Sequence, residues 1–164
     1  MAAPPPYARV MTDQKSPAEY AADIDAARQR LLTFAERCTD HNWAASPLDG
    51  DPRPVGVVVD HVAHSYEYLT GWMRDLLAGQ QVEVNADIVD LHNAQHATRA
   101  PGVSQAQAAD HLRASGDVLI ALVAGLDASQ LEAGDGRVAR FAQIAARHAD
   151  GHRTDVEAAL QAAG

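Results

Sequence analysis

Apolar residues recur at intervals of four and three residues in four separate segments, and this spacing constrains the fold more than any other feature of the sequence. It is the spacing of one face of an α-helix, whereas a half-buried strand alternates at every second residue. Ser16, Pro17 and Glu19 supply an N-cap, a proline in the first turn and a capping box. The first helix is therefore predicted to begin at Ser16, and its apolar stripe consists of Tyr20, Ile24, Ala27, Leu31, Phe34 and Cys38.

Three further segments show the same periodicity. The second helix is predicted to begin near Pro54 and to end near Gly79, where a glycine suits the C-terminal cap. The third follows a capping box of Ser104 and Gln107, and the last begins near Val138. Residues 39–53, which contain three prolines together with Asp, Asn and Gly, predict a loop.

Four long amphipathic segments without convincing strands predict an all-α fold, a four-helix bundle. The connections after the first and third helices are short, which favours antiparallel neighbours. Residues 80–102 form a much longer connection that contains a short helix over about residues 87–98. Because this connection can travel the length of the bundle, the second and third helices are predicted to run parallel and to be joined by a crossover.

Size and charge exclude several classes of protein. A chain of 164 residues fits one domain, which we assign to residues 16–164, preceded by a flexible N-terminal arm over residues 1–15. The net charge of −9 disfavours a nucleic-acid partner, and no apolar run is long enough to span a membrane. Cys38 is the only cysteine, so no intrachain disulfide can form, and we expect a cytoplasmic protein.

Histidine is unusually abundant, with eight in the chain, and two of them lie on the apolar stripe of the last helix. His148 and His152 are four residues apart, so their Cβ atoms are expected about 5–6 Å apart on one face of the helix. Two imidazoles in that arrangement can bind one metal ion, although each can equally be a hydrogen-bonded core residue. A metal site requires a third ligand from another helix.

His61, near the stripe of the second helix, is the favoured third ligand, whereas His64 is expected at the boundary or in solvent. The alternative for His61 is a core histidine bonded to a backbone or side-chain partner. Three histidines leave a coordination position open, which is typical of catalytic rather than structural sites. A divalent metal held in this way lowers the pKa of a thiol or water that it binds.

The other histidines are predicted to be peripheral: His92 and His96 on the surface or at a pocket rim, His111 and His41 in solvent. Some carboxylates are candidates for orienting the ligand histidines, or else are solvated helix charges: Asp60, Asp150 and Asp155. Asp90 and Asn93 are predicted either to line a pocket or to cap the short helix.

These motifs together resemble the DinB/YfiT-like superfamily of small helical metalloproteins. The segment NWAASPLDGDPRPVGVVVDHVAHSYEYL, with Trp43 and His61, is similar to the first part of the family pattern, and RHADGHRTDVEAAL, with His148 and His152, to its end. The middle segment DIVDLHNAQHA resembles the branch related to mycothiol-dependent maleylpyruvate isomerase, through Asp90, Asn93 and Ala94. The resemblance extends over nearly the whole chain from Ser16.

The resemblance implies a bundle with a divalent metal, zinc or nickel, held by His61, His148 and His152. It also implies a thiol S-transferase or isomerase that uses a low-molecular-weight thiol such as mycothiol on a small electrophilic substrate. Two alternatives stay open. One is a metal-dependent hydrolase, although the sequence contains no HExxH motif. The other is a non-catalytic metal-binding or stress-response module. A homodimer is a further expectation, because bundles with a long connection often expose an apolar face.

Overall fold

The computed structural model describes residues 15–163, with the exception of the side chain of Arg99, so the predicted N-terminal arm lies almost entirely outside the described residues. No β-strand occurs in this region, which confirms the all-α class. Its helices are α1 (Pro17–Arg37), α2 (Asp40–Ala44), α3 (Val55–Leu77), α4 (Ala86–Arg99), α5 (Gln105–Ala124), α6 (Ala128–Leu131) and α7 (Ala133–Ala163). Within α7, residues 134–136 have positive φ angles, and the regular helix follows them.

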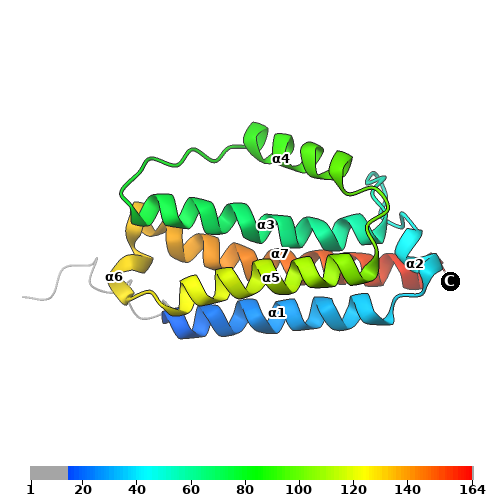
Figure 1. Cartoon of the computed structure of the whole chain (residues 1–164), viewed down its shortest axis with the longest axis horizontal. Coiled ribbons are helices and arrows are strands. Elements are labelled where there is room, and N and C mark those ends of the chain that lie inside the picture. Colours follow the sequence, from blue (N-terminus) through cyan, green and yellow to red (C-terminus); the bar gives the residue numbers. More distant parts are fainter. Residues whose placement is uncertain (1–14, 164) are drawn as a thin grey trace, which may run out of the picture.

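The four long helices α1, α3, α5 and α7 form the bundle (Figure 1). Both α1 and α3 pack against α5 and α7, so α1 and α3 lie across the bundle from each other. The helices α1 and α7 run in one direction and α3 and α5 in the other (Figure 1). The predicted crossover is therefore confirmed: α3 and α5 are parallel neighbours, and the connection between them carries α4.

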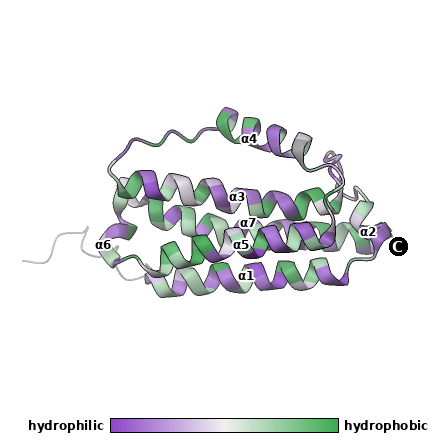
Figure 2. Cartoon of the chain, in the orientation of Figure 1, coloured by the Kyte–Doolittle hydropathy of each residue, from purple (hydrophilic) through white to green (hydrophobic). Residues whose placement is uncertain are grey.

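The predicted apolar stripes face the centre of the bundle. Ser16 caps α1, because its Oγ accepts a hydrogen bond from the amide of Glu19 while the Glu19 carboxylate accepts one from the amide of Ser16. Hydrophobic and hydrophilic residues alternate along each long helix (Figure 2), as a helix with one buried face requires. Fully buried side chains come from all four helices and include Ile24, Leu31, Val62, Met73, Leu112, Leu119, Val123 and Val138.

The prediction that residues 39–53 form a loop is partly wrong, because this segment contains the short helix α2. Thr39 caps α2 through a hydrogen bond from the amide of Asn42 to its Oγ1. The side chain of Trp43 is buried there, and its Nε1 donates a 2.8 Å hydrogen bond to the carbonyl oxygen of Val103. The indole of Trp43 also lies against Gly56, so Trp43 ties the start of α3 to the segment that leads into α5.

Helix α4 lies outside the bundle, above α3 (Figure 1). Asn85 caps it, and Leu91 on its outer face is 57% exposed. Its contacts with the bundle are mainly with α3. In the part of the chain that the structure describes, none of the helices is both long enough and apolar enough to span a membrane.

Candidate metal centre

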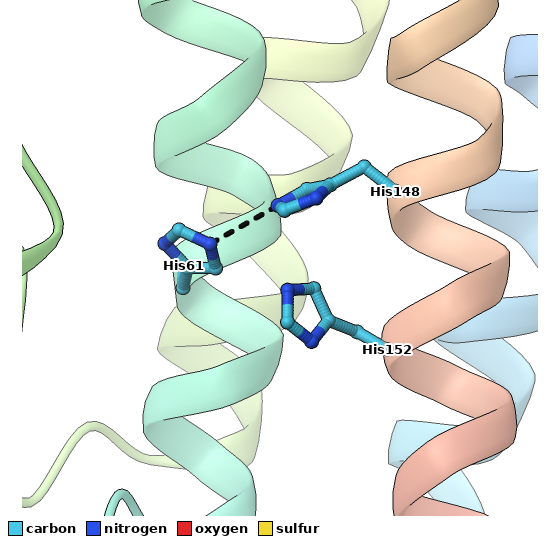
Figure 3. A group of neighbouring side chains, drawn as sticks. All are labelled: His61, His148 and His152. Atoms are coloured by element: carbon cyan, nitrogen blue, oxygen red, sulfur yellow. Dashed lines mark hydrogen bonds between the residues drawn. The ribbon is translucent and has the colours of Figure 1, made fainter. Parts of the chain in front are cut away.

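His61, His148 and His152 converge between α3 and α7, and we call them the histidine triad (Figure 3). One nitrogen atom from each side chain lies within 4.8 Å of the corresponding atoms of the other two. Among the described residues, this is the one group of three histidine, cysteine or acidic side chains with such a spacing. His61 is 2% exposed, and the other two are half-buried.

The three rings are steeply inclined to one another, with interplanar angles of 70°, 86° and 83° for the three pairs. The Nε2 atoms of His61 and His148 are 3.0 Å apart, and the ring centroids of His148 and His152 are 4.5 Å apart. A tetrahedral zinc ion with bonds of about 2.0–2.1 Å places its ligand nitrogens about 3.3 Å apart. The triad is therefore close to the spacing that one ion needs.

The surroundings of the triad keep its imidazoles neutral. Burial lowers the pKa of His61 to about 2 and that of His148 to about 4, and the neighbouring histidines add to both shifts. Burial also lowers the pKa of His152, with a further contribution from the positive charge of Arg53. Neutral imidazole is the form of histidine that binds a metal, so the lone pairs are available at neutral pH.

The hydrogen bonds around the three imidazoles indicate whether a cation would fit between them. Two neutral imidazoles share the 3.0 Å contact between His61 and His148, and only one of the two nitrogens can carry the proton between them. Ser65 contributes a further contact, with its Oγ 3.1 Å from Nε2 of His148, while it donates to the carbonyl oxygen of His61. A cation would accept the lone pairs of all three rings, and three imidazoles suit zinc or nickel.

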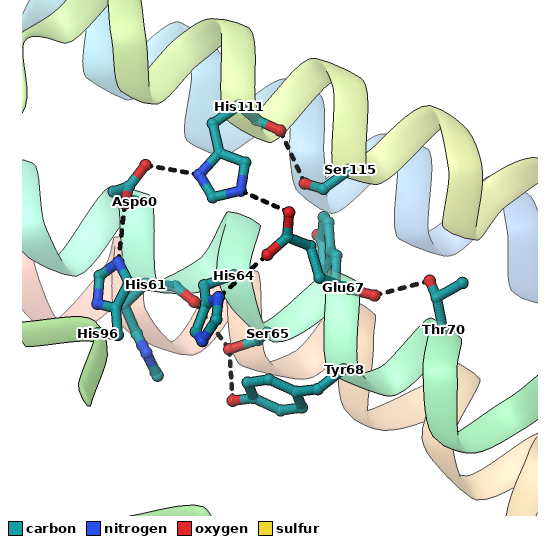
Figure 4. Close-up of polar contacts among 11 residues, drawn as sticks. Asp60, His61, His64, Ser65, Glu67, Tyr68, Thr70, His96, His111 and Ser115 are labelled. Atoms are coloured by element: carbon teal, nitrogen blue, oxygen red, sulfur yellow. Dashed lines mark hydrogen bonds and ion pairs between the residues drawn. The ribbon is translucent and has the colours of Figure 1, made fainter. Parts of the chain in front are cut away.

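A second polar group lies on the neighbouring face of α3, and we call it the imidazole–carboxylate network (Figure 4). Asp60 accepts hydrogen bonds from Nε2 of His96 at 2.7 Å and from Nδ1 of His111 at 2.8 Å. Glu67 contacts the other nitrogen of His111 at 3.1 Å and Nδ1 of His64 at 3.0 Å. The network thus links α4 and α5 through α3.

His111 is the cation of this network. Both of its ring nitrogens face carboxylate oxygens, which requires a proton on each. Hydrogen bonds to Asp60 and Glu67 accordingly raise the pKa of His111 to about 9, against the effect of its partial burial. Burial opposes ionisation of Asp60, but hydrogen bonds from His111 and His96 prevail and lower the pKa of its carboxyl group.

The structure decides between the two alternatives for His96 and corrects the predictions for His111 and Asp60. His96 is not at the surface but lines a pocket, and it is 4% exposed because α4 turns it inward onto the carboxylate of Asp60. His111 is partly buried between two carboxylates rather than solvated. Asp60 does not orient a histidine of the triad, because its two oxygens bond His96 and His111 instead.

The remaining candidates are Asp90, Asn93, Asp150 and Asp155. Asp90 is exposed, and Asn93 is half-buried with its Oδ1 unpartnered. Neither caps the short helix, because Asn85 does so. Asp150 pairs with Arg30 on α1 rather than with a histidine of the triad. Asp155 is exposed, and its negative charge acts on His152, where it opposes the lowering of the pKa.

A cavity of about 560 Å³ adjoins the network. Its lining includes the five network residues, together with residues 100–103 after α4 and Gln107 of α5. The triad does not line it, but the ring centroid of His96 is 5.7 Å from that of His61. His96 therefore stands between the cavity and the triad.

Comparison with known proteins places the chain in a family. The sequence profile of the DinB superfamily matches residues 23–156, a range that includes all four long helices and the triad. Neither the curated proteins nor the solved structures contain a significant match to the chain. Because the family match extends over most of the sequence, the chain belongs to the DinB superfamily.

Proposed function

We propose that the histidine triad binds one divalent metal ion, with zinc and nickel as the expected metals. The observation that carries the proposal is the convergence of three neutral imidazoles from two helices, with their nitrogens within 4.8 Å of one another. Three protein ligands leave room in the coordination sphere for a small molecule. When bound, such an ion acts as a Lewis acid and lowers the pKa of a thiol or water that it holds.

We further propose that the metal-loaded protein is a thiol S-transferase or isomerase, which uses a low-molecular-weight thiol such as mycothiol and a small electrophilic substrate. Similarity to the branch of mycothiol-dependent maleylpyruvate isomerase supports this reaction. The chain offers no thiol of its own for it, since Cys38 is half-buried at the end of α1 and burial raises the pKa of its thiol. The nucleophile would therefore come from a second molecule.

The cavity beside the triad supports an enzyme rather than a structural metal site. Its volume of about 560 Å³ suits a small organic molecule. His96 lines it and lies next to His61, so a ligand in the cavity would be close to the metal. We also propose a cytoplasmic location, because the chain has a single cysteine, and a homodimer. The net charge of −9 supports the expectation that no nucleic acid is bound.

Metal analysis of the purified protein tests the first part of the proposal. We expect about one zinc or nickel ion per chain in the wild type and a large loss in His148→Ala and His152→Ala. His41→Ala is the matched control, because His41 is an exposed histidine on α2. Equal metal content in all four proteins would overturn the proposal.

A conjugation assay tests the second part. The metal-loaded protein is incubated with mycothiol, bacillithiol or glutathione and a generic electrophile, and the loss of free thiol is followed. We expect one thiol to react faster with the wild type than with His148→Ala. Metal binding without any such difference would overturn the transferase reaction and leave the metal site standing.

A further inference from the structure

Two buried ring nitrogens near the triad have no hydrogen-bond partner. They are Nδ1 of His61 and Nδ1 of His96. The two side chains are 2% and 4% exposed, so water does not reach them freely. An unpartnered buried nitrogen is energetically unfavourable, so two of them on neighbouring rings call for a physical explanation.

The hydrogen bonds of the other ring nitrogens fix which of the two is a donor. Nε2 of His61 faces His148 and the proposed metal, so in a neutral ring the proton lies on Nδ1. Nε2 of His96 is 2.7 Å from the carboxylate of Asp60, so it carries the proton and leaves a lone pair on Nδ1. One unpartnered nitrogen is thus a donor and the other an acceptor.

The distance between the rings suits such a pair. The ring centroids of His61 and His96 are 5.7 Å apart, against 5.0 Å for His61 and His148, whose nitrogens are in contact at 3.0 Å. A contact between the two Nδ1 atoms would require an inward shift of α4 or a bridging water. Such a shift is feasible, because α4 contacts mainly α3 and lies outside the bundle (Figure 1).

We propose that His96 is a positioning residue of the metal centre, whose Nδ1 accepts the Nδ1 proton of His61 while Asp60 holds His96 in the required tautomer. The inference rests on the proposed metal site. A hydrogen-bond acceptor behind a ligand histidine fixes the orientation of its ring and increases its basicity. Helix α4 thereby becomes part of the metal centre, although it supplies none of the three ligands.

Zinc affinity, measured by competition with a chromophoric chelator, tests this role. We expect His96→Leu to weaken zinc binding by about 10- to 100-fold, the usual effect of losing such a partner. His96→Gln keeps one donor and one acceptor, so it is expected to bind zinc within about threefold of the wild type. His92→Leu, one turn earlier on α4, is the matched control and is also expected to bind like the wild type.

The tautomers can be read directly in the wild type, which keeps the test valid if His96→Leu does not fold. In ¹⁵N-histidine spectra of the zinc-loaded protein, we expect a proton on Nδ1 of His61 and on Nε2 of His96. A proton on Nδ1 of His96 would overturn the inference, as would unchanged zinc affinity in a folded His96→Leu protein. A wild type that binds no zinc would instead overturn the proposed function itself.

Discussion

Asp60 and His61 are consecutive residues of α3, yet their side chains belong to two different polar groups. His61 meets His148 of α7, whereas Asp60 bonds His96 of α4 and His111 of α5. Successive residues of an α-helix point about 100° apart, so one turn of α3 serves both groups. Changes on the α4 side of this turn are therefore expected to reach the metal centre.

Zinc is expected to stabilise the folded protein. A ligand that binds only the folded state at about 100 times its Kd adds about 2.7 kcal/mol to the free energy of unfolding. For a domain of this size, that corresponds to a rise in Tm of about 5–10 °C. Thermal unfolding of the wild type with zinc or with a chelator measures the shift. His148→Ala should show almost no shift, and an equal shift in both proteins would place the zinc elsewhere.

The metal-free protein is expected to lose stability in mild acid. The pKa of His148 is lowered from 6.5 to about 4 by burial and by His152, so its contribution is complete above pH 6.5 and is lost as the pH falls toward 4. Between neutral pH and pH 5, this histidine alone is expected to lower the free energy of unfolding by on the order of 2 kcal/mol. Urea unfolding at pH 7.5 and pH 5 should show a smaller acid loss in His148→Gln than in the wild type. Identical losses would contradict the lowered pKa.

His111 is expected to have the opposite dependence. Its pKa is raised from 6.5 to about 9, so its ion pairs stabilise the fold fully below pH 6.5 and lose their effect as the pH rises through 9. With its side chain 30% exposed, solvent screening limits the contribution to about 1–2 kcal/mol. His111→Gln should therefore be destabilised relative to the wild type at pH 6 but hardly at pH 10. A constant difference in the free energy of unfolding would refute the charged state of His111.

Two glycines of α3 provide a matched pair for the packing of Trp43. A Cβ atom at Gly56 would lie 2.5 Å from Nε1 of Trp43, whereas a Cβ at Gly71 meets nothing within 4 Å. Gly56→Ala is expected to destabilise the protein by about 1–3 kcal/mol, because the indole must move away from its bond to Val103. Gly71→Ala is expected to stabilise α3 by about 0.5–1 kcal/mol. Chemical denaturation compares both variants, and a similar effect of the two would exclude the clash.

The long helices could be predicted because their information is local. Each apolar stripe repeats over five or more turns, and residues such as Ile24, Leu31 and Val138 all prove to be buried. The same stripe places His148 and His152 on the inner face of α7. Parallel packing of α3 and α5 followed from the length of the connection between them, which is also a property of the sequence.

The imidazole–carboxylate network could not be predicted, because it depends on contacts between distant parts of the chain. Asp60 is 36 residues from His96 and 51 residues from His111. Helix α4 has only a weak apolar face, so its periodicity does not show which side turns inward. The one local signal was the pair of histidines His92 and His96, four residues apart, which has the same spacing as the true triad pair.

Because α4 lies outside the bundle, the residues that pack the four long helices are separate from the α4 residues that border the cavity. Substitutions on its outward face, where Leu91 already stands in solvent, leave the packing of the four long helices untouched. Its inward face borders the cavity and the ligand His61. Substitutions on the inward face of α4 are therefore expected to change the chemistry of the site, while the four long helices keep their packing.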